Sequence, residues 1–504
     1  MSDTKKLEAL RAEAASLRKE LAAKGSLSPK DRRAIAQQDM PSQDPQVRRH
    51  NMNEVALGYF EDQAVVESLR CLGCANKPCV SGCPVSIDIP SFLAQTAAGK
   101  FDEAYATIRE SSMLPAICGR VCPQEKQCMA KCTVGKVEKD PEKSVAIGRV
   151  ERFLADRGRA LAASPNAPKV AAPRPKASGF RVAIVGSGPS GLTAAADLAR
   201  LGHDVTIYEA FHKPGGVAVY GIPEFRLPKA IVEEEARSLE LLGVKIVCDF
   251  LVGRTRTVHD LLEKDGFGAV YIATGAGLPK FMGIPGEDLV GVFSANEYLT
   301  RSNLMKAYDR EEAATPLYSA KRVAVFGGGN VAMDAARTAL RVGADEVRIV
   351  YRRTEAEMPA RVEEVHHAKE EGVIFDYLAN PTAIIGDEKG RVKAAVCQRY
   401  KLGEPDASGR AKPIAIPGSE YTLEIDACIV ALGNDSNPLV TGTTPELKTT
   451  PRGNIIVDET GATSMSGVFA GGDIVQGAAT VILAMGDGRR AAAGIDAYLK
   501  GKKR

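Results

Sequence analysis

The sequence of 504 residues predicts an α/β protein in which an α-helical, cysteine-rich segment precedes two parallel βαβ units. Three observations support this fold class. Eight of the 11 cysteines fall between Cys71 and Cys132, in a stretch with helical periodicity and no convincing strand alternation. The apolar runs Arg181–Gly186 and Arg322–Gly327 both end in glycine and precede an alanine-rich helical pattern and a second strand. These two runs are the second and third observations, and together they indicate one supersecondary unit that occurs twice.

The composition limits the function before any motif is considered. Lys and Arg number 66 against 63 Asp and Glu, a net charge of +3, so nothing favours a nucleic acid or a membrane surface as partner. No signal peptide and no run of about 18 apolar residues is present. We therefore expect a cytoplasmic protein, in which clustered cysteines bind metal instead of forming disulfides.

Residues 1–50 are expected to form a helical N-terminal arm. Apolar side chains recur every three or four residues over 4–23, which predicts an amphipathic helix, at Leu7, Leu10, Ala14, Leu17 and Leu21. The simplest expectation is that this helix packs on its own chain; the alternative is an arm for self-association or for a partner. The polar, proline-punctuated stretch 25–45 is expected to be irregular.

Residues 51–165 are expected to form the helical domain that carries the cysteines. Their spacing is Cys71-x2-Cys74-x4-Cys79-x3-Cys83-Pro and Cys118-x3-Cys122-Pro-x4-Cys128-x3-Cys132. Tight spacings that end in Cys-Pro are typical of ferredoxin-type iron–sulfur ligation. Structural zinc sites are the alternative, but they favour paired C-x2-C knuckles, and only Cys71 and Cys74 form one. Residues 166–178, rich in Ala, Pro and Lys, are expected to be a linker.

The first glycine loop has the order Gly186-x-Gly188-x-x-Gly191 between a strand and a helix. Its glycines allow a tight turn, a close approach of backbone to a pyrophosphate, and close packing of helix on strand. The phosphates are expected at the helix N-terminus. Glu209, at the end of the second strand, is placed to accept hydrogen bonds from ribose hydroxyls.

The second glycine loop has the same mechanics and comprises Gly327, Gly329, Asn330 and Ala332. Its second strand ends in Arg352 and Arg353, where the first unit has an acid. Two guanidiniums suit the 2′-phosphate of NADP(H), which favours NADP(H) over NAD(H). The alternative is that both arginines are solvated surface charges.

The order of these loops with the later segments ATG (273–275), ALG (431–433) and GVFAGGD (467–473) resembles the glutathione-reductase-like flavin oxidoreductases. The resemblance implies an FAD domain over 179–280 and 434–504, with an NADPH domain over 281–433 inserted in it. It further implies FAD contacts, besides the first loop and Glu209, at Gly216, Thr274, Gly275, Gly472, Asp473 and Thr480. The helix that begins near residue 480 is expected to direct its N-terminus at the flavin.

Disulfide reductase activity is not expected, because Gly215-Gly216-Val217-Ala218 contains no cysteine where such enzymes need a reactive pair. The remaining cysteines, Cys248, Cys397 and Cys428, lie in apolar strand-like contexts and are expected to be buried side chains without a chemical role.

Nearly everything after residue 50 resembles a narrower family, represented by the small (β) subunit of NADPH-dependent glutamate synthase. The N-terminal part of dihydropyrimidine dehydrogenase and the NADPH-binding large subunit of NADH-dependent ferredoxin:NADP⁺ oxidoreductase are close relatives in it. The matching segments are 70–90, 115–132, 214–229, 327–344 and 467–492. The resemblance implies two 4Fe–4S clusters, one held by Cys71, Cys74, Cys79 and Cys132 and the other by Cys83, Cys122, Cys128 and Glu151. Spacing alone favours Cys118 as the last ligand, and it is kept as the alternative to Glu151.

The expected function is that of an electron-input component: NADPH reduces FAD, and single electrons pass to the clusters. In the glutamate synthase type the partner is a large subunit, because residue 2 is serine, where an amidotransferase would begin with cysteine, and the chain has no room for a glutamate-forming barrel. The alternative is an oxidoreductase between NADP(H), ferredoxin and NAD(H), electron-bifurcating or similar to sulfide dehydrogenase. Its partners would be a small flavin/2Fe–2S subunit and ferredoxin. A homo-oligomer is a further option, and the terminal acceptor is left open.

Overall fold

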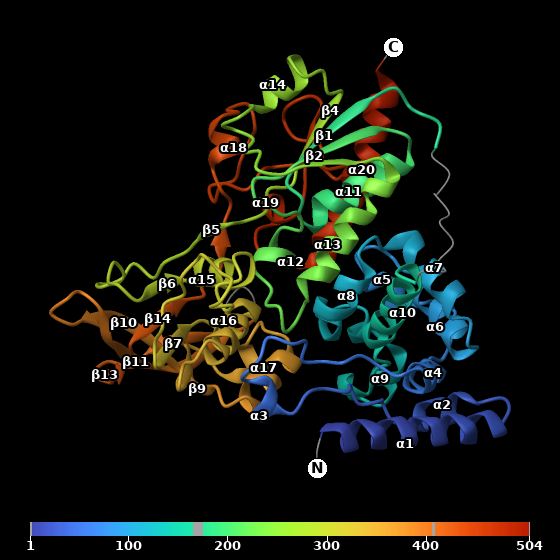
Figure 1. The fold of residues 1–504 in the computed structure, drawn as a ribbon, viewed down its shortest axis with the longest axis horizontal. Coiled ribbons are helices and arrows are strands. Elements are labelled where there is room, and N and C mark those ends of the chain that lie inside the picture. Colours follow the sequence, from blue (N-terminus) through green and yellow to red (C-terminus); the bar gives the residue numbers. More distant parts are fainter. Residues whose placement is uncertain (1–2, 165–174, 406–408, 503–504) are drawn as a thin grey trace.

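The N-terminal arm packs along the cysteine-rich helices. The computed structural model describes residues 3–164, 175–405 and 409–502, so the predicted linker lies largely outside the described residues. Helix α1 (Asp3–Ala23) buries Ala14 and Leu21, and Leu21 packs with Ile35 and with Val66 on α4 (Glu61–Leu69). The amphipathic helix is therefore confirmed, and one of its faces is covered by its own chain (Figure 1).

One expectation for the arm is wrong. Within the stretch expected to be irregular, α2 (Pro29–Ala34) forms, because Ser28 and Asp31 make a capping box. The Ser28 hydroxyl accepts from the Asp31 amide at 3.2 Å, and the Asp31 carboxylate accepts from the Ser28 amide at 2.9 Å. Pro29 occupies the first helical position, where its missing N–H costs nothing. The arm then continues through α3 (Pro45–Arg48).

The cysteine-rich region is helical, as predicted. Its helices after α4 are α5 (Pro78–Ser81), α6 (Ile89–Ala97), α7 (Phe101–Ser111), α8 (Pro115–Val121), α9 (Thr133–Val137) and α10 (Ile147–Ala162), of which α10 is the longest. Helix α10 is amphipathic and buries Ile147, Val150 and Leu154 against the rest of the bundle. Most of the cysteines lie in the turns between helices or at helix ends, and Cys118 lies within α8.

The first βαβ unit belongs to a parallel five-stranded sheet. The strand order is β16 (Val468–Ala470), β4 (Ala269–Ile272), β1 (Arg181–Val185), β2 (Asp204–Tyr208) and β3 (Lys245–Val247). Val182 and Ile184 share one continuous apolar core with α11 (Pro189–Arg200), α20 (Val481–Gly501) and the cysteine-rich helices. The opposite face packs with α14 (Val258–Glu263) and α18 (Leu439–Gly442). Helices α11 and α20 thus join this sheet to the cysteine-rich domain (Figure 1).

The second βαβ unit builds another parallel sheet, in the order β6 (Val292–Ser294), β14 (Ala427–Val430), β7 (Arg322–Phe326), β8 (Glu346–Tyr351) and β9 (Ile374–Tyr377). Helices α15 (Ala295–Asn303), α16 (Asn330–Arg341) and α17 (Val362–Glu370) accompany it. The chain passes between the two sheets beside β5 (Leu278–Pro279) and β15 (Asn434–Asp435), which pair antiparallel.

An antiparallel lobe extends from the second sheet and was not predicted. It consists of β10 (Ala379–Gly386), β11 (Val392–Pro405), β12 (Ala411–Ala415) and β13 (Tyr421–Glu424). The remaining elements are α12 (Val217–Tyr220), α13 (Lys229–Ser238), α19 (Asp473–Gln476) and the 3₁₀ turns η1 (Gln124–Lys126), η2 (Met129–Lys131), η3 (Pro141–Lys143), η4 (Glu240–Leu242) and η5 (Glu355–Glu357).

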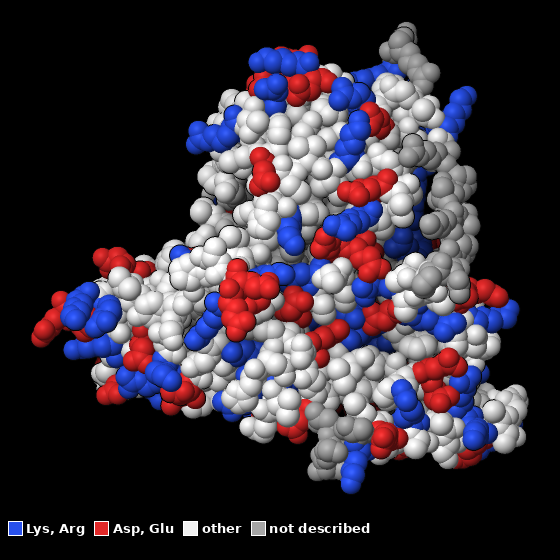
Figure 2. Space-filling view, in the orientation of Figure 1, with Lys and Arg blue, Asp and Glu red and all other residues white. Residues whose placement is uncertain are grey.

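Acidic and basic side chains are interspersed over the face of the molecule that Figure 2 shows, as the small net charge suggests. Among the described residues, no helix combines the length and the apolar character needed to cross a bilayer.

Cys397 and Cys428 are buried as expected. Cys248 is half-exposed in the turn after β3, so the prediction for that cysteine is wrong.

Candidate functional site: two cysteine-lined cavities beside two glycine loops

Four cysteines surround one cavity in the helical domain, which we call the outer cavity. Cys71, Cys74 and Cys79 come from the α4–α5 region, and Cys132 directly precedes α9. Apolar side chains complete the wall, among them Ile89, Leu93, Val134, Val145 and Ile147. The structure therefore brings together the four cysteines that the resemblance assigns to a single cluster, although Cys132 is more than 50 residues from the others in sequence.

A second cavity, the inner cavity, is lined by Cys83, Cys118, Cys122, Cys128 and Glu151. Cys118 lies on α8, Cys122 caps its C-terminus, Cys128 precedes η2, and Glu151 lies on α10. The two groups of cysteines cross over in sequence. Cys83 comes soon after the cysteines of the outer cavity but lines the inner cavity, whereas Cys132 comes soon after the cysteines of the inner cavity but lines the outer one.

The two cavities are direct neighbours, and they differ in their surroundings. Ile89 and Ile147 line both of them. The inner cavity is also lined by Ile482 of α20, and the carbonyl of Pro84 lies against Gly486 of the same helix. The inner cavity is thus the one that adjoins α20.

The chemistry of the donors fits an iron–sulfur cluster. Burial raises the pKa of the Cys79 thiol to about 12 and that of the Cys83 thiol to about 11, because the thiolate loses its hydration. Bound iron reverses this penalty by ligating the thiolates directly. No three Cys, His, Asp or Glu side chains in the described parts of the chain converge closely enough for one ion. The thiols are arranged around a space, which suits a multinuclear group.

Glu151 and Cys118 differ in how well their polar atoms are satisfied. Glu151 is buried on α10, and burial raises the pKa of its carboxyl to about 8. In the part of the chain that the structure describes, its Oε1 has no hydrogen-bond partner. The Cys118 thiol donates to Met485 Sδ at 3.4 Å, and a hydrogen bond with Cys122, together with burial, raises its pKa. A buried carboxylate oxygen without a partner is costly unless a ligand meets it.

The first glycine loop has the geometry of a phosphate-binding turn. Gly186 has φ +104°, and a Cβ there would lie 2.5 Å from the carbonyl oxygen of Ala273. A Cβ at Gly191 would lie 2.0 Å from the carbonyl oxygen of Gly186, so only glycine lets α11 approach the loop. The side of Gly188 where a Cβ would point is open, with no atom within 4 Å. The backbone at Gly188 can therefore be approached closely, as a phosphate-binding turn requires.

Glu209 lies beside this loop and already holds it. Its buried carboxylate accepts from the Ser187 amide at 2.9 Å and from the Ser187 hydroxyl, and also from the Phe211 amide at 2.9 Å. Ser187 in turn accepts from the Gly215 amide at 3.0 Å. Sequence reasoning missed Ser187, and its position between two glycines of the motif is the signal that could have identified it.

The remaining predicted FAD residues gather at the carboxyl edge of the first sheet. Thr274 and Gly275 follow β4, and Gly472 and Asp473 follow β16. Gly216 packs on the glycine loop, since a Cβ there would lie 2.7 Å from Gly188 Cα. The carboxyl ends of parallel strands share one edge, which explains why segments far apart in sequence meet here.

The α20 N-terminus also lies at this edge. Thr480 caps the helix by accepting from the Leu483 amide at 3.4 Å. The Asp473 carboxylate accepts from the Ala479 amide at 3.2 Å, and burial raises its pKa to about 6. Asp487, which no sequence signal identified, accepts from the Gly472 amide at 2.9 Å and thereby orients the turn.

The second glycine loop repeats the first at the carboxyl end of β7. A Cβ at Gly327 would lie 2.4 Å from the carbonyl oxygen of Ala431, while Gly329 faces open space apart from Pro359 at 3.8 Å. Ala332 is buried in α16. The Asn330 side chain accepts from the Arg361 amide at 2.9 Å, which ties the loop to the segment that follows η5.

Arg352 and Arg353 occupy different environments. Arg352 is exposed at the end of β8. Arg353 is buried, and its Nε donates to the carbonyl oxygen of Ala411 in β12 at 2.7 Å. The structure thus places one guanidinium at the surface beside the second loop and anchors the other in the antiparallel lobe, a distinction that the sequence could not make.

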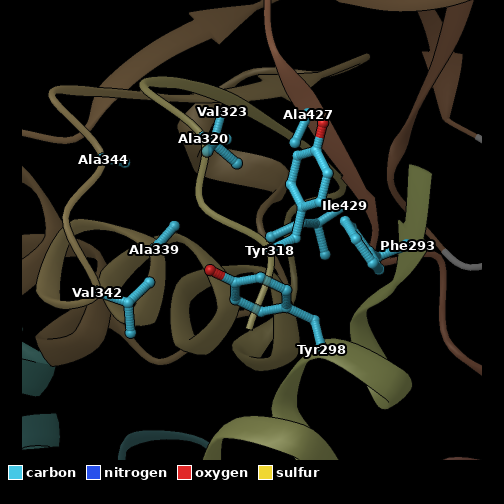
Figure 3. Close-up of a pocket in the computed structure, with 10 residues that line it drawn as sticks. All are labelled: Phe293, Tyr298, Tyr318, Ala320, Val323, Ala339, Val342, Ala344, Ala427 and Ile429. Atoms are coloured by element: carbon cyan, nitrogen blue, oxygen red, sulfur yellow. The ribbon is translucent and has the colours of Figure 1, made fainter. Parts of the chain in front are cut away.

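A separate small cavity in the second βαβ domain lies away from this loop. Figure 3 shows its aromatic lining of Phe293, Tyr298 and Tyr318. Val323 and Ala427 also line it, at the amino ends of β7 and β14. The glycine loop follows the opposite end of β7, so this cavity is not part of the nucleotide site.

Two family models match separate parts of the chain. Residues 48–162 match the model for dihydropyrimidine dehydrogenase domain II, 4Fe-4S cluster. Residues 180–488 match the pyridine nucleotide-disulphide oxidoreductase model.

Individual relatives cover most of the chain. It is 39% identical over 472 residues to the NADPH-dependent glutamate synthase small chain of Azospirillum brasilense, covering 92% of this chain and 95% of that protein. It is 42% identical over 442 residues to subunit beta of the NADP⁺-dependent formate dehydrogenase of Moorella thermoacetica. That match covers 84% of this chain and 60% of the formate dehydrogenase subunit. Among solved structures, Mycobacterium tuberculosis FprA in complex with NADPH aligns with a TM-score of 0.54 at 22% identity, over 64% of this chain and 85% of that one. That last likeness concerns the fold.

Proposed function

Since the chain belongs to the family of the NADPH-dependent glutamate synthase small chain, and is an NADPH-dependent FAD and iron–sulfur oxidoreductase, we propose that it carries two 4Fe–4S clusters and acts as an electron-input subunit. The observation that carries the proposal is the pair of neighbouring cysteine-lined cavities, the inner of which is lined in part by Ile482 of α20. A partner subunit then receives the electrons.

The proposed cofactor sites follow the geometry. FAD lies along the first glycine loop at the carboxyl edge of the first sheet, in a domain of residues 179–280 and 434–504. NADPH lies along the second loop, in residues 281–433. The outer cavity holds one cluster through its four cysteines, and the inner cavity holds the other through Cys83, Cys122, Cys128 and Glu151. The unpartnered Glu151 oxygen supports the last assignment over Cys118.

The chain's own residues position and insulate these groups. When bound, NADPH would supply a hydride, FAD would take up its two electrons and its proton, and the clusters would pass electrons one at a time. The glycine loops and the amides at the starts of α11 and α16 bind phosphates, Ser187 and Glu209 hold the first loop in shape, and Asp473 fixes the turn before α20. Apolar residues such as Ile89, Ile147 and Ile482 exclude water from the cavities.

The proposal is tested by the composition of the purified protein. Prepared without oxygen, it should contain FAD and about eight irons per chain. NADPH should bleach the flavin absorbance faster than NADH does. Zinc in place of iron, or faster bleaching by NADH, would contradict the proposal. We further propose a cytoplasmic location, on the ground that thiolate ligands require a reducing compartment.

Arg352 is proposed to bind the 2′-phosphate directly, with Arg353 supporting the strand end through the Ala411 carbonyl. Arg352→Ala should therefore raise the KM for NADPH about tenfold while leaving the KM for NADH nearly unchanged, because a charge-assisted contact to phosphate contributes about 1.5–3 kcal/mol. Steady-state flavin reduction with both nucleotides measures this split. An equal loss for NADPH and NADH would count against the role.

A second acceptor is favoured by the similarity to a formate dehydrogenase subunit. In that case the subunit exchanges electrons between NADP(H) and a partner other than glutamate synthase. An acceptor assay distinguishes the two candidate functions. It compares the rate of NADPH oxidation with 2-oxoglutarate plus glutamine or ammonia against the rate with ferredoxin plus NAD⁺.

A further inference from the structure

The segment between two cysteines of the inner cavity contacts the flavin-binding edge of the first sheet. Gln127 lines the inner cavity, and its Nε2 donates to Thr480 Oγ1 at 3.2 Å. Thr480 is the N-cap of α20. A single side chain therefore connects the wall of the inner cavity with the helix terminus that the proposed function places at the flavin.

The backbone around Gln127 is closely packed. A Cβ at Gly82 would lie 2.8 Å from the carbonyl oxygen of Gln127, and the Gln127 amide donates to the Gln124 carbonyl at 3.0 Å. The neighbouring Lys126 ammonium donates to the Pro359 carbonyl at 2.8 Å, in the segment that follows η5. The backbone position of Gln127 is thus defined from several sides.

We propose that Gln127 is a positioning residue for electron transfer between the flavin and the inner-cavity cluster. In this step one electron leaves the reduced flavin and enters the cluster, so the flavin is oxidised by one electron and the cluster reduced by one, with no bond formed or broken. Electrons cross bonded and hydrogen-bonded atoms faster than an empty gap. The Gln127–Thr480 hydrogen bond supplies such a contact and holds α20 at a constant separation from the cavity.

Two variants separate this role from simple support. Gln127→Leu keeps the volume and removes the hydrogen bond. Gln127→Glu restores it, because the carboxylate can accept from the Thr480 hydroxyl. The readouts are the rate at which NADPH bleaches the flavin, the rate at which the reduced-cluster signal then appears in rapid-freeze electron paramagnetic resonance, and iron content with thermal unfolding.

In Gln127→Leu the cluster signal should appear about tenfold more slowly, as is typical when a supporting contact of a metal site is removed. Flavin bleaching by NADPH and iron content should stay at wild-type values, and Gln127→Glu should recover at least part of the rate. The matched control is Gln37→Leu, which loses hydrogen bonds to the carbonyls of Glu142 and Ser144 at 2.8 and 2.7 Å in the same domain, away from α20. It should leave both rates unchanged.

The inference rests on the proposed cluster in the inner cavity, and the two can fail separately. Wild-type protein without that cluster signal would overturn the proposed function. Wild-type protein with both clusters, combined with an unchanged rate in Gln127→Leu or an equal loss in Gln37→Leu, would overturn only the role of Gln127. Loss of iron in Gln127→Leu but not in Gln127→Glu would also overturn it, by making Gln127 a support of the cluster itself.

Discussion

Replacing Glu151 by alanine is expected to leave the chain with about half of its iron and to slow NADPH-driven electron delivery about 10- to 100-fold. The physical reason is that Glu151 is buried at the inner cavity, and its Oε1 has no hydrogen-bond partner among the described residues. Removing the carboxylate leaves three cysteines to hold a cluster that requires a fourth ligand. Iron per chain and the resonance signal of the chemically reduced protein measure the loss.

The matched variants for Glu151 are Cys118→Ala and Glu151→Gln. Cys118→Ala should keep both cluster signals, because the Cys118 thiol already donates a hydrogen bond to Met485 Sδ and is hydrogen-bonded with Cys122. Glu151→Gln should keep both as well, since an amide oxygen can take the place of the carboxylate. Loss of a cluster in Cys118→Ala, with both retained in Glu151→Ala, would assign Cys118 as the ligand.

Arg337→Leu is expected to destabilise the protein by about 3–5 kcal/mol, the usual cost of breaking a buried ion pair from one side. Arg337 is fully buried on α16, where it donates to the Glu371 carboxylate at 2.7 and 2.9 Å and to Glu364. The same cluster ties three parts of the chain together, because Arg226 pairs with Asp334 at 2.7 Å and Arg48 pairs with Glu371 at 2.9 Å. Thermal unfolding followed by circular dichroism measures the loss.

The destabilisation should depend on pH in a defined direction. Burial acts to raise the pKa of Glu364, but the guanidiniums of Arg226 and Arg337 lower it from 4.5 to about 2. A carboxylate whose pKa is depressed by folding stabilises the folded state at pH values above its pKa in the unfolded chain. That contribution is lost as the pH falls toward 2. The difference in free energy of unfolding between wild type and Arg337→Leu should therefore become smaller below about pH 4.

The control for Arg337 is Arg301→Leu on α15, whose ion pair with Glu297 is exposed. It should change stability by less than about 1 kcal/mol. A loss in Arg301→Leu that equals the loss in Arg337→Leu would contradict the argument from burial.

Local patterns were sufficient wherever the signal lies in a short window. The second strand predicted in each βαβ unit forms, as Asp204–Tyr208 and Glu346–Tyr351, because β-branched runs between turn-forming residues strongly favour strands. The same reasoning failed at α2, where the capping box of Ser28 and Asp31 outweighs the apparent irregularity of a polar stretch. The antiparallel lobe β10–β13 escaped notice because its strands alternate weakly and mix exposed with half-buried positions.

Pairing across long sequence separations could not be derived from the chain alone. Spacing shows that eight thiols lie near one another, but not that Cys132 completes the outer set while Cys83 joins the inner one. The resemblance supplied that grouping, and the structure shows why it is feasible: the turns around η1 and η2 return the chain to the α5 region. The contrast between Arg352 and Arg353 likewise depends on β12, which approaches from about 60 residues away.

The sequence by itself determined the order of domains, the two glycine loops and the chemical nature of the donors, because these depend on residue type and on neighbours within one turn or strand. Only the tertiary structure decided which donors share a cavity, which cavity adjoins α20, and which side chains, such as Gln127 and Asp487, connect the parts. The physical reason is that contacts between distant segments arise from the packing of whole helices and sheets. The energy of that packing is spread over many apolar residues and appears in no single motif.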